Sequence, residues 1–175
     1  MKISIFVILL FCSSIAVSKK TLNKAFEGNW VEDISKRGNV RKIFKSFNLS
    51  DTFIKKVADS KVAAKVHIKL NDDSVKTETV YGSESFKDTL EIKLNDKEKE
   101  KQHHDFHMFG GEKLFDYGIG KKHFIINIYN KDDKNKAIAT IKRELVSDKV
   151  MKMTLQNKKD NTKLSSIFKK DKKNT

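Results

Sequence analysis

The stretch TIKRELVSDKVMKMTL, residues 140–155, contains two runs of alternating apolar and polar residues around the polar turn VSDK, residues 146–149. Side chains two positions apart on a strand point to the same face, so the apolar residues of each run would share one face. These residues are Ile141, Leu145, Met151, Met153 and Leu155. The stretch therefore predicts a β-hairpin with one sheltered and one exposed face.

Arg143 lies on the sheltered face of this hairpin, between Ile141 and Leu145. A buried guanidinium without a partner is costly, so another protein group or a ligand must neutralise it. Arg143 is one of three arginines in a chain that otherwise uses lysine, and a guanidinium forms a planar two-bond fork with a carboxylate. We predict that Arg143 binds a carboxylate, either of a ligand or of a protein residue such as Asp116.

The same two-residue period continues along the chain from Ala64 onward. Its apolar positions are Ala64, Val66, Ile68 and Leu70, then Leu90, Ile92 and Leu94, and then Phe124, Ile126 and Ile128. The segments between them are typical of hairpin turns: NDDS at 71–74, YGSES at 81–85, FGGEK at 109–113 and NKDDKNK at 130–136. We interpret this pattern as an antiparallel meander closed into a barrel, and barrels of this size commonly hold a small ligand.

Two short helices are expected ahead of the meander. The first would bury one stripe with the i, i+3, i+4, i+7 spacing, formed by Val40, Ile43, Phe44 and Phe47. Ser50 or Asp51 would cap the second helix, whose apolar residues are Ile54, Val57 and Ala58. Trp30 precedes both helices, and we expect this lone tryptophan to pack in the core.

Residues 1–18 have the features of a secretory signal peptide, since Lys2 precedes an apolar run that ends in small residues. The run is short for a membrane span. We therefore expect a secreted, extracellular protein in which residues 19–175 form a single domain with a lysine-rich C-terminal tail, because no proline or Gly/Ser linker divides them. Cys12 is the only cysteine and lies within residues 1–18, so no disulfide is expected in the mature chain.

The formal net charge of +14 suggests attraction to anionic surfaces. However, acidic residues are interleaved with the lysines, and no basic run alternates with stacking aromatics, so nucleic acid is not an expected partner. A cationic module that binds anionic glycans or membranes remains an alternative function. The salt dependence of binding would distinguish the two, because salt weakens binding to a charged surface but has little effect on an enclosed ligand.

The segment HHDFH, residues 103–107, is the candidate metal site in this sequence. On a strand His103, Asp105 and His107 point the same way, but the outer two are about 13 Å apart. An exposed polar face is therefore the preferred interpretation, and we expect no metal and no cofactor. The sequence also lacks a cysteine nucleophile in the mature chain, a Gly-x-Ser-x-Gly elbow and a phosphate-binding glycine loop, so no enzyme activity is expected.

Three segments together resemble the fatty-acid-binding and cellular retinoid-binding protein family. They are FEGNWVEDIS at 26–35, IKKVADSKVAAKVHI at 54–68 and TIKRELVSDKVMKMTL at 140–155, and the resemblance extends over roughly residues 25–170. It implies a mainly β, calycin-like fold: a ten-stranded antiparallel β-barrel, or β-clam, with a two-helix lid after the first strand. It also implies that a long-chain fatty acid or a retinoid is enclosed in an internal cavity for transport or buffering. Export would make this chain similar to the secreted nematode members.

In this family a ligand carboxylate meets an arginine on the strand that matches TIKREL, which implies this role for Arg143. The family's second anchor, an Arg-x-Tyr pair on the last strand, aligns with Ser166 and Phe168 in LSSIFKKD, residues 164–171. The resemblance thus implies Ser166 as a hydroxyl donor and Phe168 as an apolar wall, without the second arginine. A lipocalin that carries another small apolar ligand is the nearest alternative, and the helix pair and the absence of disulfides argue against it.

The predicted helix pair suggests two further features. Its lysines Lys42, Lys45, Lys55 and Lys56 could guide the lid onto anionic membranes. Asn48 begins the sequon Asn-Leu-Ser between the two helices and is a candidate glycosylation site in a secreted chain. We expect the protein to be a monomer.

Overall fold

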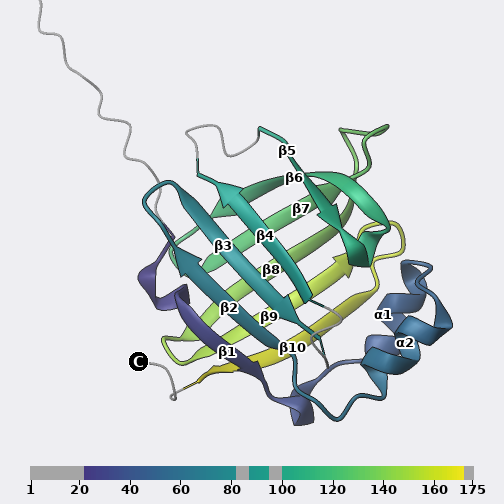
Figure 1. The fold of residues 1–175 in the computed structure, drawn as a ribbon, viewed down its shortest axis with the longest axis horizontal. Helices are drawn as coiled ribbons and strands as arrows, with labels where there is room; N and C mark the ends of the chain where they lie inside the picture. The colour runs from purple at the N-terminus through teal and green to yellow at the C-terminus, as the bar shows by residue number, and fades with distance from the viewer. Residues whose placement is uncertain (1–21, 82–86, 95–99, 172–175) are drawn as a thin grey trace, which may run out of the picture.

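The computed structural model describes residues 22–81, 87–94 and 100–171, apart from the side chain of His107. In this part of the chain, ten antiparallel strands curve into a nearly closed barrel, and two helices follow the first strand (Figure 1). The predicted fold class is therefore confirmed. The predicted signal peptide, and Lys172 and Lys173 of the predicted tail, lie outside the described residues.

The strands are β1 (Gly28–Glu32), β2 (Lys65–Leu70), β3 (Ser74–Val80), β4 (Lys87–Lys93), β5 (Gln102–Phe106), β6 (Gly111–Ile119), β7 (His123–Tyr129), β8 (Ala137–Ser147), β9 (Val150–Asn157) and β10 (Lys163–Lys170). The helices are α1 (Val40–Ser46) and α2 (Asp51–Ala58), with 3-10 turns η1 (Lys24–Phe26), η2 (Ile34–Lys36) and η4 (His107–Phe109). The order across the sheet is β4-β3-β2-β1-β10-β9-β8-β7-β6-β5. The hairpin predicted from residues 140–155 is the β8–β9 pair, in which Arg143 lies opposite Met153.

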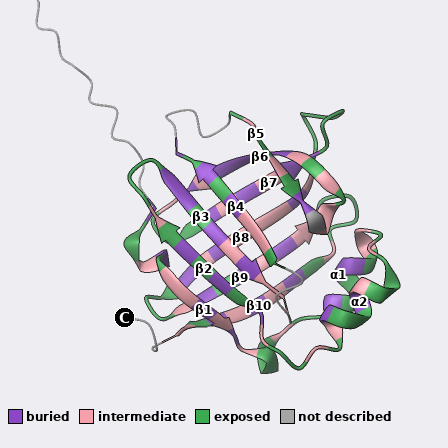
Figure 2. Ribbon diagram, in the orientation of Figure 1, coloured by how far each residue is buried: buried purple, intermediate pink, exposed green. Residues whose placement is uncertain are grey.

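Burial alternates along the strands because one face of the sheet lines the barrel and the other faces solvent (Figure 2). In β2, for example, Val66 and Ile68 are buried whereas Lys65 and His67 are exposed. Trp30 is fully buried in β1, and its indole Nε1 donates a hydrogen bond to the Phe26 carbonyl at 2.8 Å. The predicted core role of Trp30 is therefore confirmed.

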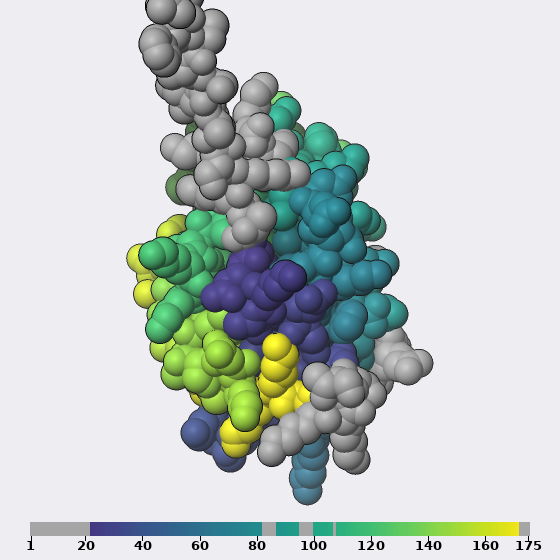
Figure 3. All heavy atoms as spheres, turned by 90° about the vertical axis from the view of Figure 1, so that its left-hand side faces the viewer, coloured from purple at the N-terminus to yellow at the C-terminus, as the bar shows by residue number. Residues whose placement is uncertain are grey.

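Different segments cover different sides of the barrel. The helix pair packs beside the strands on one side, and residues 22–26 lie on another, between strands from the two halves of the sheet (Figures 1 and 3). Leu22 and Phe26 of this N-terminal segment are buried. Helix α2 begins after Ser50, whose Oγ accepts a hydrogen bond from the Phe53 amide, so Ser50 is the N-cap. None of the helices in the described residues is long and apolar enough to cross a membrane.

The barrel is not closed by backbone pairing between β4 and β5, the two edges of the sheet. Side chains bridge these edges instead. The amide of Gln102 accepts from the Lys93 N–H at 3.0 Å and donates to the Lys93 carbonyl at 2.8 Å. His104 Nε2 lies 3.2 Å from Asp88 Oδ1. The two edges of the sheet are thus joined by contacts of the Gln102, His104 and Asp88 side chains and not by a ladder of backbone hydrogen bonds.

Asn157 attaches the end of α1 to the barrel. Its side-chain amide donates to the Ser46 carbonyl at 2.7 Å and to Ser46 Oγ at 3.1 Å. Because Asn157 is buried, Asn157→Ala would leave the helix-end carbonyl without its donor, and we expect the free energy of unfolding to fall by about 1–3 kcal/mol. Urea denaturation measures this loss, and Asn130→Ala in an exposed loop is the control. Equal stability of the two variants would contradict the assigned role.

Candidate ligand site

A pocket lies inside the barrel, with α1 at one end. Strands β3 and β4 line one side, and β7, β8 and β9 line the other. About 640 Å³ of space among the lining side chains is not filled by atoms, part of it open to solvent. Most of the wall is apolar and includes Phe44, Leu90, Phe106, Phe109, Ile126 and Ile141.

Arg143 enters this pocket from β8, as the alternation of Ile141, Arg143 and Leu145 predicts. The residue is only 4% exposed, and its Nε and Nη1 have no hydrogen-bond partner within the described residues. Burial lowers the pKa of Arg143 from its ordinary value to about 10, although nearby Tyr81 and Asp88 act in the opposite direction. The guanidinium is therefore charged at neutral pH, and among the described residues its Nε and Nη1 lack the partners that burial demands.

Asp116 does not supply that partner. Its carboxylate accepts from Asn127 at 2.8 Å and from the Tyr129 hydroxyl at 2.7 Å, and it lies 3.8 Å from the Lys101 ammonium. Phe115 and Tyr117 on either side of it belong to the core, so Asp116 lies on the outer face of β6. The alternative of an Arg143–Asp116 ion pair is therefore wrong.

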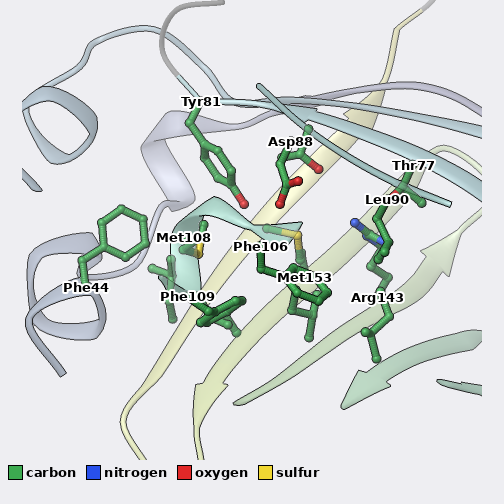
Figure 4. A pocket seen from close by; sticks show the side chains of 15 residues that line it. Phe44, Thr77, Tyr81, Asp88, Leu90, Phe106, Met108, Phe109, Arg143 and Met153 are labelled. Atoms are coloured by element: carbon green, nitrogen blue, oxygen red, sulfur yellow. The ribbon is translucent and has the colours of Figure 1, made fainter. Parts of the chain in front are cut away.

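Tyr81 and Asp88 add polar groups to the pocket that the sequence interpretation did not identify. Figure 4 shows the Tyr81 hydroxyl and the Asp88 carboxylate projecting into the pocket, with Tyr81 nearer to Phe44 and the Arg143 guanidinium near Leu90 and Thr77. Burial raises the pKa of the Tyr81 phenol, which keeps it protonated as a donor. The buried hydroxyls of Thr77 and Thr79 also line this pocket. Asp88 shares a strand face with Leu90 and Ile92. A charged residue on an otherwise apolar face is the same signal that identified Arg143, so Asp88 could have been found in the sequence.

Ser166 and Phe168 are buried inside the barrel but line a neighbouring pocket. Along the sheet, Ser166 lies opposite Met153, which in turn lies opposite Arg143. Met153 lines both pockets. The structure thus places Ser166 and Phe168 on the same inner face as Arg143 but does not bring them into its pocket.

The neighbouring pocket also contains a buried ion pair. Arg37 Nη2 lies 2.5 Å from Glu32 Oε2, and the same oxygen accepts from the Ala64 amide at 3.1 Å. Arg37 further donates to the carbonyls of Ser60 and Val62. The guanidinium of Arg37 is therefore satisfied by the protein, in contrast to that of Arg143.

The HHDFH segment does not bring its three candidate ligands onto one strand face. Strand β5 ends at Phe106, and His107 begins the 3-10 turn η4. His103 is exposed and contacts Glu112, whereas His104 contacts Asp88. In the described residues no group of three or more His, Cys, Asp or Glu side chains could hold a metal ion.

The candidate surface sites on the helix pair are accessible. Asn48 is exposed in the turn between α1 and α2, where its φ of 57° is in the left-handed region. The lysines at 42, 45, 55 and 56 are also exposed. Glycosylation and membrane contact stay predictions.

No model of a known protein family matches the sequence, and no curated protein is significantly similar to it. Solved structures do share the fold. Lipid binding protein 8 of Caenorhabditis elegans is 16% identical, with 87% of this chain and 100% of that chain covered and a TM-score of 0.67. A fatty-acid-binding protein from brain tissue of Drosophila melanogaster is 16% identical, with 86% and 99% covered and a TM-score of 0.64. The fluorescent protein UnaG is 13% identical, with 85% and 98% covered and a TM-score of 0.67.

These likenesses show that the chain has the fold of fatty-acid-binding proteins. The identity is too low for a ligand to be carried over from any one of them. The ligand has to be argued from the residues of the pocket.

Proposed function

We propose that this protein is a non-enzymatic carrier that encloses a long-chain fatty acid, or a retinoid carboxylate, inside its barrel. The observation that carries the proposal is the buried guanidinium of Arg143, whose Nε and Nη1 lack partners in the described residues. A ligand carboxylate would supply the two oxygens that fit a guanidinium fork. Each buried methylene contributes about 0.8 kcal/mol, so the acyl chain provides most of the affinity and Arg143 provides the orientation.

Displacement of a fluorescent fatty acid from the purified protein tests this function. We expect stearic acid to compete at one molecule per protein and methyl stearate to compete about tenfold more weakly, because the ester cannot form the charge-assisted pair with Arg143. The stearic acid affinity should change little between about 0.05 M and about 0.5 M salt, since the pair is buried. Absence of competition, or an affinity that falls steeply with salt, would favour a cationic surface site for anionic glycans or membranes instead.

We propose further that the carrier is secreted after removal of residues 1–18, as the apolar run behind Lys2 suggests. Expression of the full chain in cultured eukaryotic cells should release into the medium a protein whose N-terminus is Lys19. Retention in the cell with an intact N-terminus would contradict secretion. Treatment of the released protein with a glycosidase would show whether Asn48 carries a glycan.

Transfer of the ligand would occur from a monomer whose helix lid touches anionic membranes. The four exposed lysines of the helix pair supply the positive charge for this contact. Faster fatty-acid transfer to vesicles that contain phosphatidylserine than to neutral vesicles would support it. Equal transfer rates would exclude an electrostatic contact.

A further inference from the structure

The pocket that holds Arg143 also receives a negative charge from the opposite side. Asp88 lies on β4, on the same strand face as Leu90, and lines the pocket together with Arg143 (Figure 4). No ion pair joins Asp88 to Arg143 within the described residues, where the side-chain contact of Asp88 is with His104. The pocket therefore offers two separate charged groups to whatever it encloses.

Only part of the Asp88 carboxylate is used by the protein. Its Oδ1 lies 3.2 Å from His104 Nε2, and no described residue donates to Oδ2. The Tyr81 hydroxyl, which projects into the pocket beside Asp88, likewise has no hydrogen-bond partner in the described part of the chain. Asp88 and Tyr81 thus form a polar pair with one acceptor and one hydroxyl that no described residue occupies.

An unsubstituted acyl chain would leave these groups unsatisfied. Figure 4 shows the Asp88 carboxylate between the Tyr81 hydroxyl and the Arg143 guanidinium. A chain that starts with its carboxylate on Arg143 and runs past Asp88 toward Tyr81 would meet the Asp88–Tyr81 pair with methylene groups. Covering a carboxylate oxygen with hydrocarbon removes its water without replacing the hydrogen bond, which costs free energy. A ligand that carries a donor at this point of its chain avoids that cost.

We infer that the preferred ligand is a hydroxylated long-chain fatty acid, with its carboxylate on Arg143 and its chain hydroxyl donating to Asp88. The Tyr81 phenol donates to the oxygen of the same hydroxyl. This inference rests on the proposed function and names the ligand class of the same pocket. Asp88 is then the residue that determines specificity, whereas Arg143 recognises any fatty acid.

The rival interpretation is that Asp88 serves only to hold the opening between β4 and β5 through His104. The two roles can be separated because they use different neighbours. Replacing His104 breaks the bridge but leaves the Asp88 carboxylate in the pocket. Replacing Asp88 removes both.

The experiment compares stearic acid with a series of monohydroxystearic acids that differ only in the position of the hydroxyl. With the wild-type protein, we expect at least one position to bind about tenfold more tightly than stearic acid, as a hydrogen bond to a charged group allows. Asp88→Leu should abolish this preference and bind stearic acid at least as tightly as wild type does. His104→Val should keep the preference, and so should the matched control Glu91→Leu, which changes an exposed residue of the same strand.

The outcomes distinguish this inference from the function on which it rests. If stearic acid, the hydroxylated acids and retinoic acid all fail to bind, the proposed function fails. If stearic acid binds and no hydroxylated acid binds more tightly, only the inference fails, and the wild-type series alone decides this even where Asp88→Leu does not fold. A preference that survives Asp88→Leu, or that disappears in His104→Val, would also overturn the role of Asp88.

Discussion

Replacing Arg143 with methionine is expected to raise the free energy of unfolding of the ligand-free protein by about 2–3 kcal/mol and to remove its preference for carboxylates over esters. A tenfold change in proton affinity corresponds to about 1.4 kcal/mol. The lowering of the Arg143 pKa to about 10 therefore means that its surroundings, burial above all, disfavour the charged guanidinium by roughly 3 kcal/mol. Methionine removes this cost and fills the apolar space with a flexible side chain. Denaturant unfolding and displacement by stearic acid and its methyl ester measure the two effects.

The matched control is Arg41→Met. Arg41 forms an ion pair with Asp59 at the surface, where both side chains are about half exposed, so this variant should change stability by less than about 1 kcal/mol and leave binding unchanged. A clear loss of stability in Arg143→Met would mean that Arg143 has a protein partner in the folded state. An unchanged ratio of acid to ester affinity would remove Arg143 from the ligand site.

Replacing Glu32 with alanine is expected to lower the free energy of unfolding by about 3–5 kcal/mol, the usual cost of breaking a buried ion pair from one side. The side chains of Glu32 and Arg37 are 5% and 11% exposed, so Arg37 would keep its charge without a counter-ion. The Ala64 amide would also lose its acceptor. Urea denaturation measures the loss. Glu112→Ala, which removes a half-exposed carboxylate paired with Lys131, should cost less than about 1 kcal/mol.

The Glu32–Arg37 ion pair also attaches the helix pair α1–α2 to the barrel. Arg37 precedes α1, and the carbonyls it binds, those of Ser60 and Val62, follow α2. Glu32→Ala should therefore speed ligand exchange as well as lower stability. The double variant Glu32→Leu with Arg37→Met should recover much of the lost stability, because an apolar pair leaves no buried charge. Failure to recover it would mean that the backbone hydrogen bonds of Arg37, and not the charge pair, dominate at this site.

The sequence predicted the barrel well because alternation is a direct consequence of strand geometry. Arg143 was identifiable for the same reason, as a cation on an otherwise apolar face. Asp116 shows where this reasoning fails. Leu114, on the same face of β6 as Asp116, and Phe115, on the opposite face, are both buried. The apolar residues therefore did not indicate which face of β6 lines the barrel. The core positions of Phe115 and Tyr117 and the pairing of β6 with β7 place Asp116 outside.

The composition of the pocket was harder to predict than the position of Arg143. Tyr81 belongs to a segment that was interpreted as a hairpin turn, and its position beside Asp88 depends on the pairing of β3 with β4. Ser166 and Phe168 were assigned to the Arg143 site through the resemblance alone. Met153 lies between Ser166 and Arg143 in the sheet, and it lines both pockets. The distance between side chains on strands that are not neighbours cannot be predicted from their spacing in the sequence.

The opening between β4 and β5 has a consequence for solubility. Unpaired strand edges can recruit strands from other molecules and so promote aggregation. In this barrel the Gln102 amide behaves as a substitute peptide group, since it occupies both the N–H and the carbonyl of Lys93. The charged, exposed side chains of Lys87, Glu91 and Lys93 further discourage a foreign strand from pairing with β4. A sheet that leaves its two edges unpaired can therefore remain soluble at high concentration because each edge already faces, and partly shields, the other.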